Sequence, residues 1–167
     1  MLKSISYTAV LSMLLITSCL TDETDTRTYE QEMIELDVLI QSIIAEGTVV
    51  DTTDLGVYYI IEEEGEGDFA QVGDTISIEY AGYLTDGNIF DISSDYYEDG
   101  IWEFVYGEQS LITGFDDALS LMRVNREAEF IIPSTLAYGA YGYGSIGSYQ
   151  TSIFVIKMHD LKPVQDQ

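Results

Sequence analysis

The sequence has few of the residues on which redox, metal and nucleophilic chemistry depend. It contains one cysteine and one histidine in 167 residues. A single cysteine cannot form an internal disulfide bond. His159 has no second histidine with which to share a metal ion, and no serine has the histidine partner that nucleophilic catalysis normally requires. We therefore expect no metal site.

Basic residues are also scarce. Lys and Arg total 6 against 30 Asp and Glu, so the formal net charge is −24 at pH 7, and no Lys or Arg occurs from Thr28 to Met122. Such a charge excludes nucleic acid as a partner, because the phosphate backbone would be repelled. Carboxylates in the stretch without cations must be held by hydroxyls, backbone amides or water. Most of the charge is typical of a solvated surface.

The apolar run near the start of the chain is too short to span a bilayer. It extends from Val10 to Ile16 and leads into Ile16-Thr17-Ser18-Cys19, which resembles a bacterial lipobox. We expect residues 1–18 to be a lipoprotein signal peptide, with a lipid on Cys19 and an acidic, disordered tether over residues 19–28. The lipid would attach the protein to a membrane of the bacterial cell envelope, on the periplasmic face or the outer surface. The alternative is an ordinary signal peptide with an incidental cysteine.

From Tyr29 onward, hydrophobic residues recur with the spacing of a helix. This pattern predicts an amphipathic helix over residues 29–47 that ends at Gly47. Thr28 and Gln31 would form its capping box. The expected apolar stripe comprises Met33, Leu36, Ile40 and Ile43, widened by Ile34 and Ile44. A helix with such a face must pack on something, which is either its own domain or a second copy of the chain in a homodimer.

After a connector over residues 48–55, the spacing of hydrophobic residues changes to two, which is typical of an antiparallel sheet. The predicted strands are residues 57–62, 75–84, 102–106, 126–132 and 151–160, with an acidic turn at 62–67. Phe115, Ala118, Leu119 and Met122 follow Thr113 with helical spacing. The predicted fold is α+β, a curved antiparallel β-sheet wrapped around one short α-helix, over residues 56–161 with a tail at 162–167. Such a fold leaves a pocket between the sheet and the helix.

Four strings in this domain carry a more specific signal. They are Ile78-Glu79-Tyr80-Ala81-Gly82-Tyr83-Leu84-Thr85-Asp86-Gly87, Ile89-Phe90-Asp91-Ile92-Ser93-Ser94, Ile112-Thr113-Gly114-Phe115 and Ile132-Pro133-Ser134-Thr135-Leu136-Ala137-Tyr138-Gly139. In this order they resemble the FKBP-type peptidyl-prolyl cis-trans isomerases. The resemblance covers residues 56–161 and implies proline-containing polypeptide substrates and no cofactor.

The resemblance also implies a site. It surrounds the proline ring with hydrophobic residues, namely Tyr80, Phe90, Trp102, Leu111, Ile112, Phe115 and Phe154. Phe115 takes the floor position that is often tryptophan. The Tyr138 hydroxyl and the Ile112 backbone amide match donors to substrate carbonyls, and Asp91 matches the carboxylate of the pocket. Strand alternation selects Phe154 over Val155, because Phe154 shares a face with Ile156 and Met158.

Two features depart from the family pattern. Residues 95–100 hold no arginine, so Asp91 must rely on Tyr80, Tyr138 or backbone donors. The loop over residues 139–149 lacks the prolines frequent there. Its Tyr143 and Ile146 suit a binding rim for extended peptides, although a mobile loop that shields the core from water is equally compatible.

Two functional classes remain open. The first is a lipid-tethered peptidyl-prolyl isomerase that assists the folding of exported or envelope proteins. It would act by desolvation and by binding the twisted Xaa-Pro imide in an apolar pocket. The second is a non-catalytic peptide-binding chaperone or assembly module on the same fold. The complete aromatic set, together with Tyr138, favours the enzyme.

Overall fold

The computed structural model describes residues 27–164. The predicted signal peptide, Cys19, nearly all of the tether and the last three residues lie outside the described residues. Within residues 27–164, neither α-helix has the length and hydrophobicity that crossing a membrane requires.

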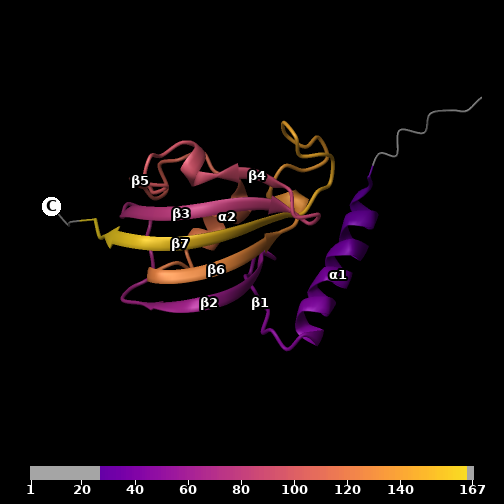
Figure 1. Ribbon diagram of the computed structural model, residues 1–167, viewed down its shortest axis with the longest axis horizontal. Coiled ribbons are helices and arrows are strands. Elements are labelled where there is room, and N and C mark those ends of the chain that lie inside the picture. Colours follow the sequence, from indigo (N-terminus) through magenta and orange to yellow (C-terminus); the bar gives the residue numbers. More distant parts are fainter. Residues whose placement is uncertain (1–26, 165–167) are drawn as a thin grey trace, which may run out of the picture.

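A curved antiparallel sheet around one short helix forms the body of the molecule, which confirms the predicted α+β class (Figure 1). The elements are α1 (Tyr29–Ala45), β1 (Asp51–Thr52), β2 (Tyr58–Glu66), β3 (Thr75–Leu84), β4 (Ile89–Ile92), β5 (Trp102–Val105), α2 (Thr113–Leu119), β6 (Val124–Ile132) and β7 (Ser152–Lys162), with short 3₁₀ turns at Ser93–Asp95 and Ser134–Leu136. The strand order is β1-β2-β6-β7-β3-β4, and β5 pairs with β3. Every strand pair is antiparallel.

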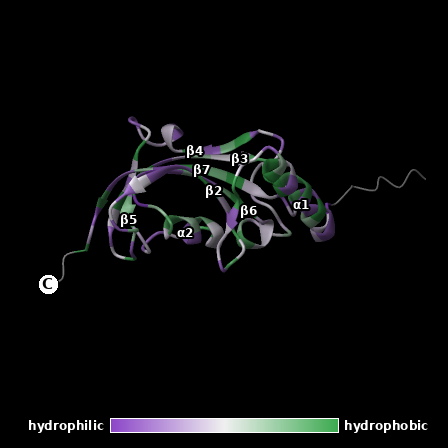
Figure 2. Cartoon of the chain, turned by 90° about the horizontal axis from the view of Figure 1, so that it is seen from below, coloured by the Kyte–Doolittle hydropathy of each residue, from purple (hydrophilic) through white to green (hydrophobic). Residues whose placement is uncertain are grey.

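The main core fills the space between the concave face of the sheet and α2, which lies beneath the arch in Figure 2. Alternation along β7 directs Phe154, Ile156 and Met158 inward, where each is at most 2% exposed. The same alternation puts Val155 on the other face, beside Lys157. The strand therefore presents Phe154 to the helix side, as its hydrophobic pattern predicted.

Helix α1 packs on the outer face of the sheet at one end (Figures 1 and 2). Its capping box forms as predicted, because Thr28 and Gln31 exchange side-chain and backbone hydrogen bonds. Leu36 and Ile40 pack on Ile131, which points away from the α2 side of β6. The helix thus docks on its own domain.

The predicted width of the apolar stripe on α1 is wrong. Ile34 is 66% exposed and Ile44 is 46% exposed, because the outer face of the sheet covers only a narrow line of the helix. That line runs through Glu32, Leu36 and Ile40, all buried. A carboxylate therefore occupies a place on the helix where an apolar side chain is expected.

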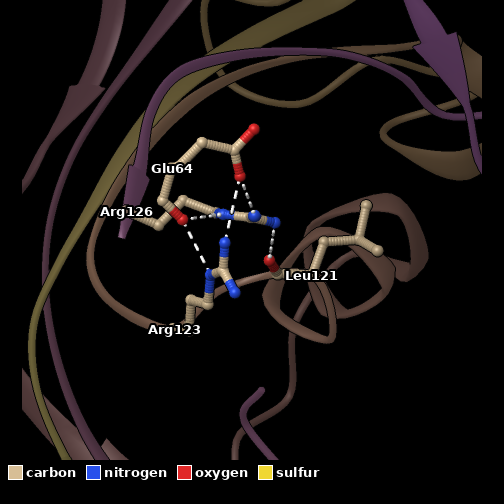
Figure 3. A network of polar contacts seen from close by, with 4 residues as sticks. All are labelled: Glu64, Leu121, Arg123 and Arg126. Carbon is tan, nitrogen blue, oxygen red and sulfur yellow. Dashed lines mark hydrogen bonds and ion pairs between the residues drawn. The ribbon is translucent and has the colours of Figure 1, made fainter. Parts of the chain in front are cut away.

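The acidic turn predicted at residues 62–67 is also wrong, since β2 continues to Glu66 and pairs with β6. Arg126 in the paired strand β6 and Arg123 just before it stabilise this extension by binding the Glu64 carboxylate at 2.8 and 3.0 Å (Figure 3). Arg126 is 6% exposed and also donates to the carbonyl oxygens of Glu64 and Leu121. The backbone at Gly65 has φ +66°, and a Cβ there would lie 2.5 Å from the backbone nitrogen of Arg126. A glycine is therefore required at this position.

Candidate active site

A hollow of about 240 Å³ opens between the sheet and α2. Its walls are Tyr80, Asp91, Trp102, Ser110, Leu111, Ile112, Phe115, Tyr138 and Phe154. These residues come from four strands, from α2 and from two loops, so only the folded chain brings them together. All of them except Ser110 belong to the site predicted from the sequence.

Phe115 forms the floor of the hollow from the first turn of α2. It is 4% exposed and meets Phe154 and Tyr80 edge-on, with ring centroids 4.9 and 5.7 Å apart. Edge-to-face packing of this kind fixes the orientation of each ring. The floor is therefore a rigid apolar surface.

Trp102 forms a side wall of the same hollow. Its ring lies 6.1 Å from that of Tyr80 and stacks on Phe104 at 4.0 Å. Tyr97, from the loop after β4, also stacks on it, at 6.2 Å with an interplanar angle of 14°. Contacts with three aromatic rings hold the indole in place.

At the entrance, Ile112 directly precedes α2 with extended backbone angles. Its N–H has no hydrogen-bond acceptor among residues 27–164. A backbone donor is thus available at the rim, beside the apolar floor.

Phe90 does not border this hollow, although the family resemblance implied a place for it around the proline ring. Its ring instead packs edge-on against Phe154 at 5.4 Å and against Tyr138 at 5.9 Å. The Phe90 and Phe154 rings both pack over Gly82 of β3. A Cβ at this position would lie 2.9 Å from the Phe90 ring and 2.8 Å from the Phe154 ring. Phe90 therefore supports two residues of the wall from behind.

A second hollow of about 190 Å³ adjoins the first and shares Asp91 and Tyr138 with it. Its remaining walls are Phe90, Tyr96, Tyr143, Gly144, Ser145 and Ile146. Tyr143 is 74% exposed and stacks on Tyr138 at 6.0 Å, whereas Ile146 is 5% exposed. The predicted rim residues thus border this second hollow and do not reach the first.

Asp91 has a tyrosine partner in place of an arginine. The Tyr80 hydroxyl donates to its carboxylate, at 3.3 Å from each oxygen. Burial, and then the negative charge of Asp91, raise the pKa of Tyr80 well above its usual value. The same two causes, in the same order, raise the pKa of Tyr138 to about 12. Both hydroxyls are therefore protonated donors at neutral pH.

Sequence reasoning missed several residues of the site. Ser110 belongs to the wall of the first hollow, Tyr96 to that of the second, and Tyr97 supports Trp102. Outside both hollows, sequence spacing also did not predict that Glu32 on α1 is fully buried, where its carboxylate accepts hydrogen bonds from Ser134 and Thr151. A signal for Glu32 existed, because it lies one turn before Leu36 and two turns before Ile40 on the apolar line of the helix.

A sequence model of the FKBP-type peptidyl-prolyl cis-trans isomerase family matches residues 66–159. The chain belongs to this family. It is 33% identical over 118 residues to the FKBP-type isomerase FkpA of Aeromonas hydrophila, covering 70% of this chain and 42% of that one. It is 34% identical over 113 residues to the FKBP-type 22 kDa isomerase of Escherichia coli K12, covering 67% of this chain and 53% of that one.

Solved structures of FKBP-type proteins share the fold. The crystal structure of FkpA from Escherichia coli matches with a TM-score of 0.65 and 26% identity, over 82% of this chain and 64% of that one. A peptidyl-prolyl isomerase from Pseudomonas syringae matches with a TM-score of 0.67 and 25% identity, over 82% and 98%. By contrast, the chain spans 42% and 50% of the length of two curated relatives, from Aeromonas hydrophila and Haemophilus influenzae.

Proposed function

We propose that this FKBP-type chain is a peptidyl-prolyl cis-trans isomerase that assists the folding of exported or envelope proteins. One observation carries the proposal. Phe115, Phe154 and Trp102 border a single hollow that the Tyr138 side chain also borders. A proline ring fits against such a floor, with polar donors at the rim for the carbonyls on either side of it.

The reaction requires little chemistry from the protein. An Xaa-Pro bond rotates over a barrier of about 18–20 kcal/mol, because the twisted amide loses its conjugation. A dry pocket that accepts the twisted form removes the water that stabilises the planar carbonyl. A thousandfold acceleration requires only about 4 kcal/mol. Apolar contacts and one or two hydrogen bonds suffice if they favour the twisted form over the planar one.

Each part of the site has a role in this mechanism. Phe115 and Phe154 exclude water from the ring, and Trp102 and Leu111 complete the wall. The Tyr138 hydroxyl and the Ile112 N–H donate to carbonyls of the substrate. Tyr80 holds Asp91 at the edge of the hollow, and Phe90 keeps Phe154 and Tyr138 in place.

A protease-free isomerisation assay on a Xaa-Pro peptide tests the activity directly. We expect the wild-type chain to accelerate cis-trans exchange and Phe154→Leu to lower kcat/KM. Val155→Ala, on the opposite face of the same strand, is the matched control and should retain the wild-type rate. Peptide binding without acceleration would support the alternative, a non-catalytic chaperone or assembly module.

We also propose that a lipid on Cys19 attaches the protein to the bacterial cell envelope. The proposal rests on the apolar run that ends at Ile16-Thr17-Ser18-Cys19. Lipid labelling in a bacterial host, with Cys19→Ser as the control, tests it. Labelling of the wild type alone, with processing that is sensitive to globomycin, is the expected result. An unlabelled but processed wild-type chain would indicate an ordinary signal peptide.

We further propose that α1 can pair two copies of the chain through its outer face. Ile34 and Val38 lie one turn apart on that face and are 66% and 63% exposed. Sedimentation over a range of concentrations tests this proposal. We expect Ile34→Ser with Val38→Ser to abolish a dimer that the wild type forms, and a monomeric wild type at every concentration would contradict it.

A further inference from the structure

The carboxylate of Glu32 joins α1 to both ends of the segment between β6 and β7, residues 133–151, which we call the β6–β7 loop. One oxygen, Oε1, accepts from the Ser134 N–H at 2.6 Å and from the Thr151 hydroxyl at 2.9 Å. The other, Oε2, accepts from the Ser134 hydroxyl at 2.5 Å. Ser134 follows β6 by two residues and Thr151 directly precedes β7. A single side chain therefore closes the base of the loop.

This arrangement is unusual for a charged group. Glu32 is 0% exposed, Ser134 is 1% and Thr151 is 2%. None of the ion pairs found within residues 27–164 includes Glu32. A buried carboxylate without a cation is costly unless hydrogen bonds replace its water, and here three donors do so. All three hydrogen bonds are therefore needed to offset the burial of this one carboxylate.

The loop so closed carries residues of both hollows. Tyr138 borders both of them, and Tyr143 and Ile146 border the second. Near Ser134 the loop's backbone bonds form a tight turn, and beyond Gly139 they join Tyr143 with Ile146 and Tyr149 with Gly139. Tyr29 of α1 adds an edge-on contact to Tyr149, at 6.4 Å between ring centroids. Figure 1 shows the loop, in orange to gold, between the end of the sheet and α1.

We infer that Glu32 is a positioning residue of the isomerase site. By fixing the two ends of the β6–β7 loop it sets where the Tyr138 hydroxyl stands relative to the Phe115 floor. The inference rests on the proposed activity, but the contact of Glu32 with the loop can be measured without it. Helix α1 then takes part in isomerisation, although it lies outside residues 66–159, which the family model matches.

Substitutions of Glu32 separate its geometry from its charge. Glu32→Gln keeps the reach of the side chain, and its amide oxygen can accept from the Ser134 N–H and the Thr151 hydroxyl. Its NH₂ group can donate to the Ser134 oxygen, since a hydroxyl also accepts. Glu32→Ala leaves all three donors unpaired. Asp37→Ala, an exposed carboxylate on the same helix, is the matched control.

Hydrogen exchange on the full chain tests the contact by itself. In Glu32→Ala we expect the amides of Tyr143, Ile146 and Tyr149 to exchange about tenfold faster or more, while the amides of β3 and β7 change little. Glu32→Gln and Asp37→Ala should match the wild type. Unchanged loop amides in Glu32→Ala, or equal acceleration throughout the domain, would overturn the inference.

A double-mutant cycle tests the link to the site. Glu32→Ala should lower kcat/KM up to about fivefold, the loss expected for removal of the Tyr138 hydroxyl itself, mainly through kcat, in the wild-type background. If Glu32 acts through Tyr138, the same substitution should change kcat/KM by less than about twofold in Tyr138→Phe. Equal losses in the two backgrounds would mean that Glu32 has only a structural role. A wild-type chain without activity would contradict the proposed function instead, and hydrogen exchange would still decide whether Glu32 holds the loop.

Discussion

The Tyr80 hydroxyl lies 3.3 Å from both carboxylate oxygens of Asp91 and takes the place of a basic partner. Tyr80 comes from β3 and Asp91 from β4, so the bond ties neighbouring strands at the edge of the hollow. The donor to the Asp91 carboxylate is thus a neutral phenol and not a cation. An anionic pocket can thus be built in a stretch of chain without Lys or Arg.

Removing this bond should affect activity more than stability. Tyr80→Phe keeps the ring on Phe115 but leaves Asp91 without its donor, and we expect kcat/KM to fall about tenfold with a loss of about 1 kcal/mol in the free energy of unfolding. Tyr106→Phe is the control, because it also loses one hydroxyl bond, to the Asp116 carbonyl, away from the hollow. Equal activity of the two variants would show that the bond has no part in the site.

Phe90→Ala should reduce activity more than Tyr138→Phe. Phe90 holds both Phe154 and Tyr138 by edge-on contacts, so its removal loosens two walls, whereas Tyr138→Phe removes one hydroxyl. We expect a loss of about 2 kcal/mol in transition-state stabilisation for Phe90→Ala and about 1 kcal/mol for Tyr138→Phe. The ratio of kcat/KM values in a protease-free assay measures both. The reverse order would argue against a mechanism dominated by desolvation.

Stability should fall as the pH rises above about 10. Burial raises the pKa of Tyr138 and of Tyr106 to about 12, and that of Tyr80 beyond it, whereas an unfolded tyrosine loses its proton near pH 10. The unfolded state then binds fewer protons than the folded one, so deprotonation favours unfolding. The stability that these three protonated tyrosines contribute is complete below pH 10 and is lost as the pH rises toward 12. Urea midpoints from pH 7 to pH 11 test this, and Tyr106→Phe should decline less steeply than the wild type.

The Arg126 side chain should contribute much more to stability than Arg123. Arg126 is buried and binds the Glu64 carboxylate and the carbonyls of Glu64 and Leu121 (Figure 3). Arg126→Met leaves the Leu121 carbonyl without this donor and leaves Arg123 as the one arginine bound to Glu64. We expect a loss of about 2 kcal/mol in the free energy of unfolding for Arg126→Met, because the buried guanidinium loses its hydrogen bonds to two carbonyls. Arg123→Met, at a more exposed position, should lose less than about 1 kcal/mol. Similar midpoints in urea for both variants would contradict this assignment.

The sequence predicted the parts of the fold that hydrophobic spacing determines. Strand β3 has the predicted bounds, and α2 begins at Thr113 as its pattern indicated. The pocket followed as well, because the four strings place Tyr80, Ile112, Phe115 and Tyr138 on elements that converge. Local spacing carries this information whenever one face of an element is buried.

What the sequence did not predict depends on partners far along the chain. Strand β2 continues through its glutamates because Arg123 and Arg126, about sixty residues later, bind Glu64. Glu32 is buried because Ser134 and Thr151, more than a hundred residues later, supply donors. The short strands β1 and β4 likewise form by pairing with β2 and β3. None of these contacts leaves a pattern in a local window of sequence.

In the proposed mechanism, a dry pocket eases rotation of the Xaa-Pro bond without moving a proton. The most direct test of this mechanism is kcat/KM of the full chain on a Xaa-Pro peptide, measured in H₂O and in D₂O from pH 6 to pH 9. We predict clear acceleration over the uncatalysed exchange, with the same value in both solvents and across the pH range. No acceleration, or a rate that is lower in D₂O and follows a titration curve, would contradict the account.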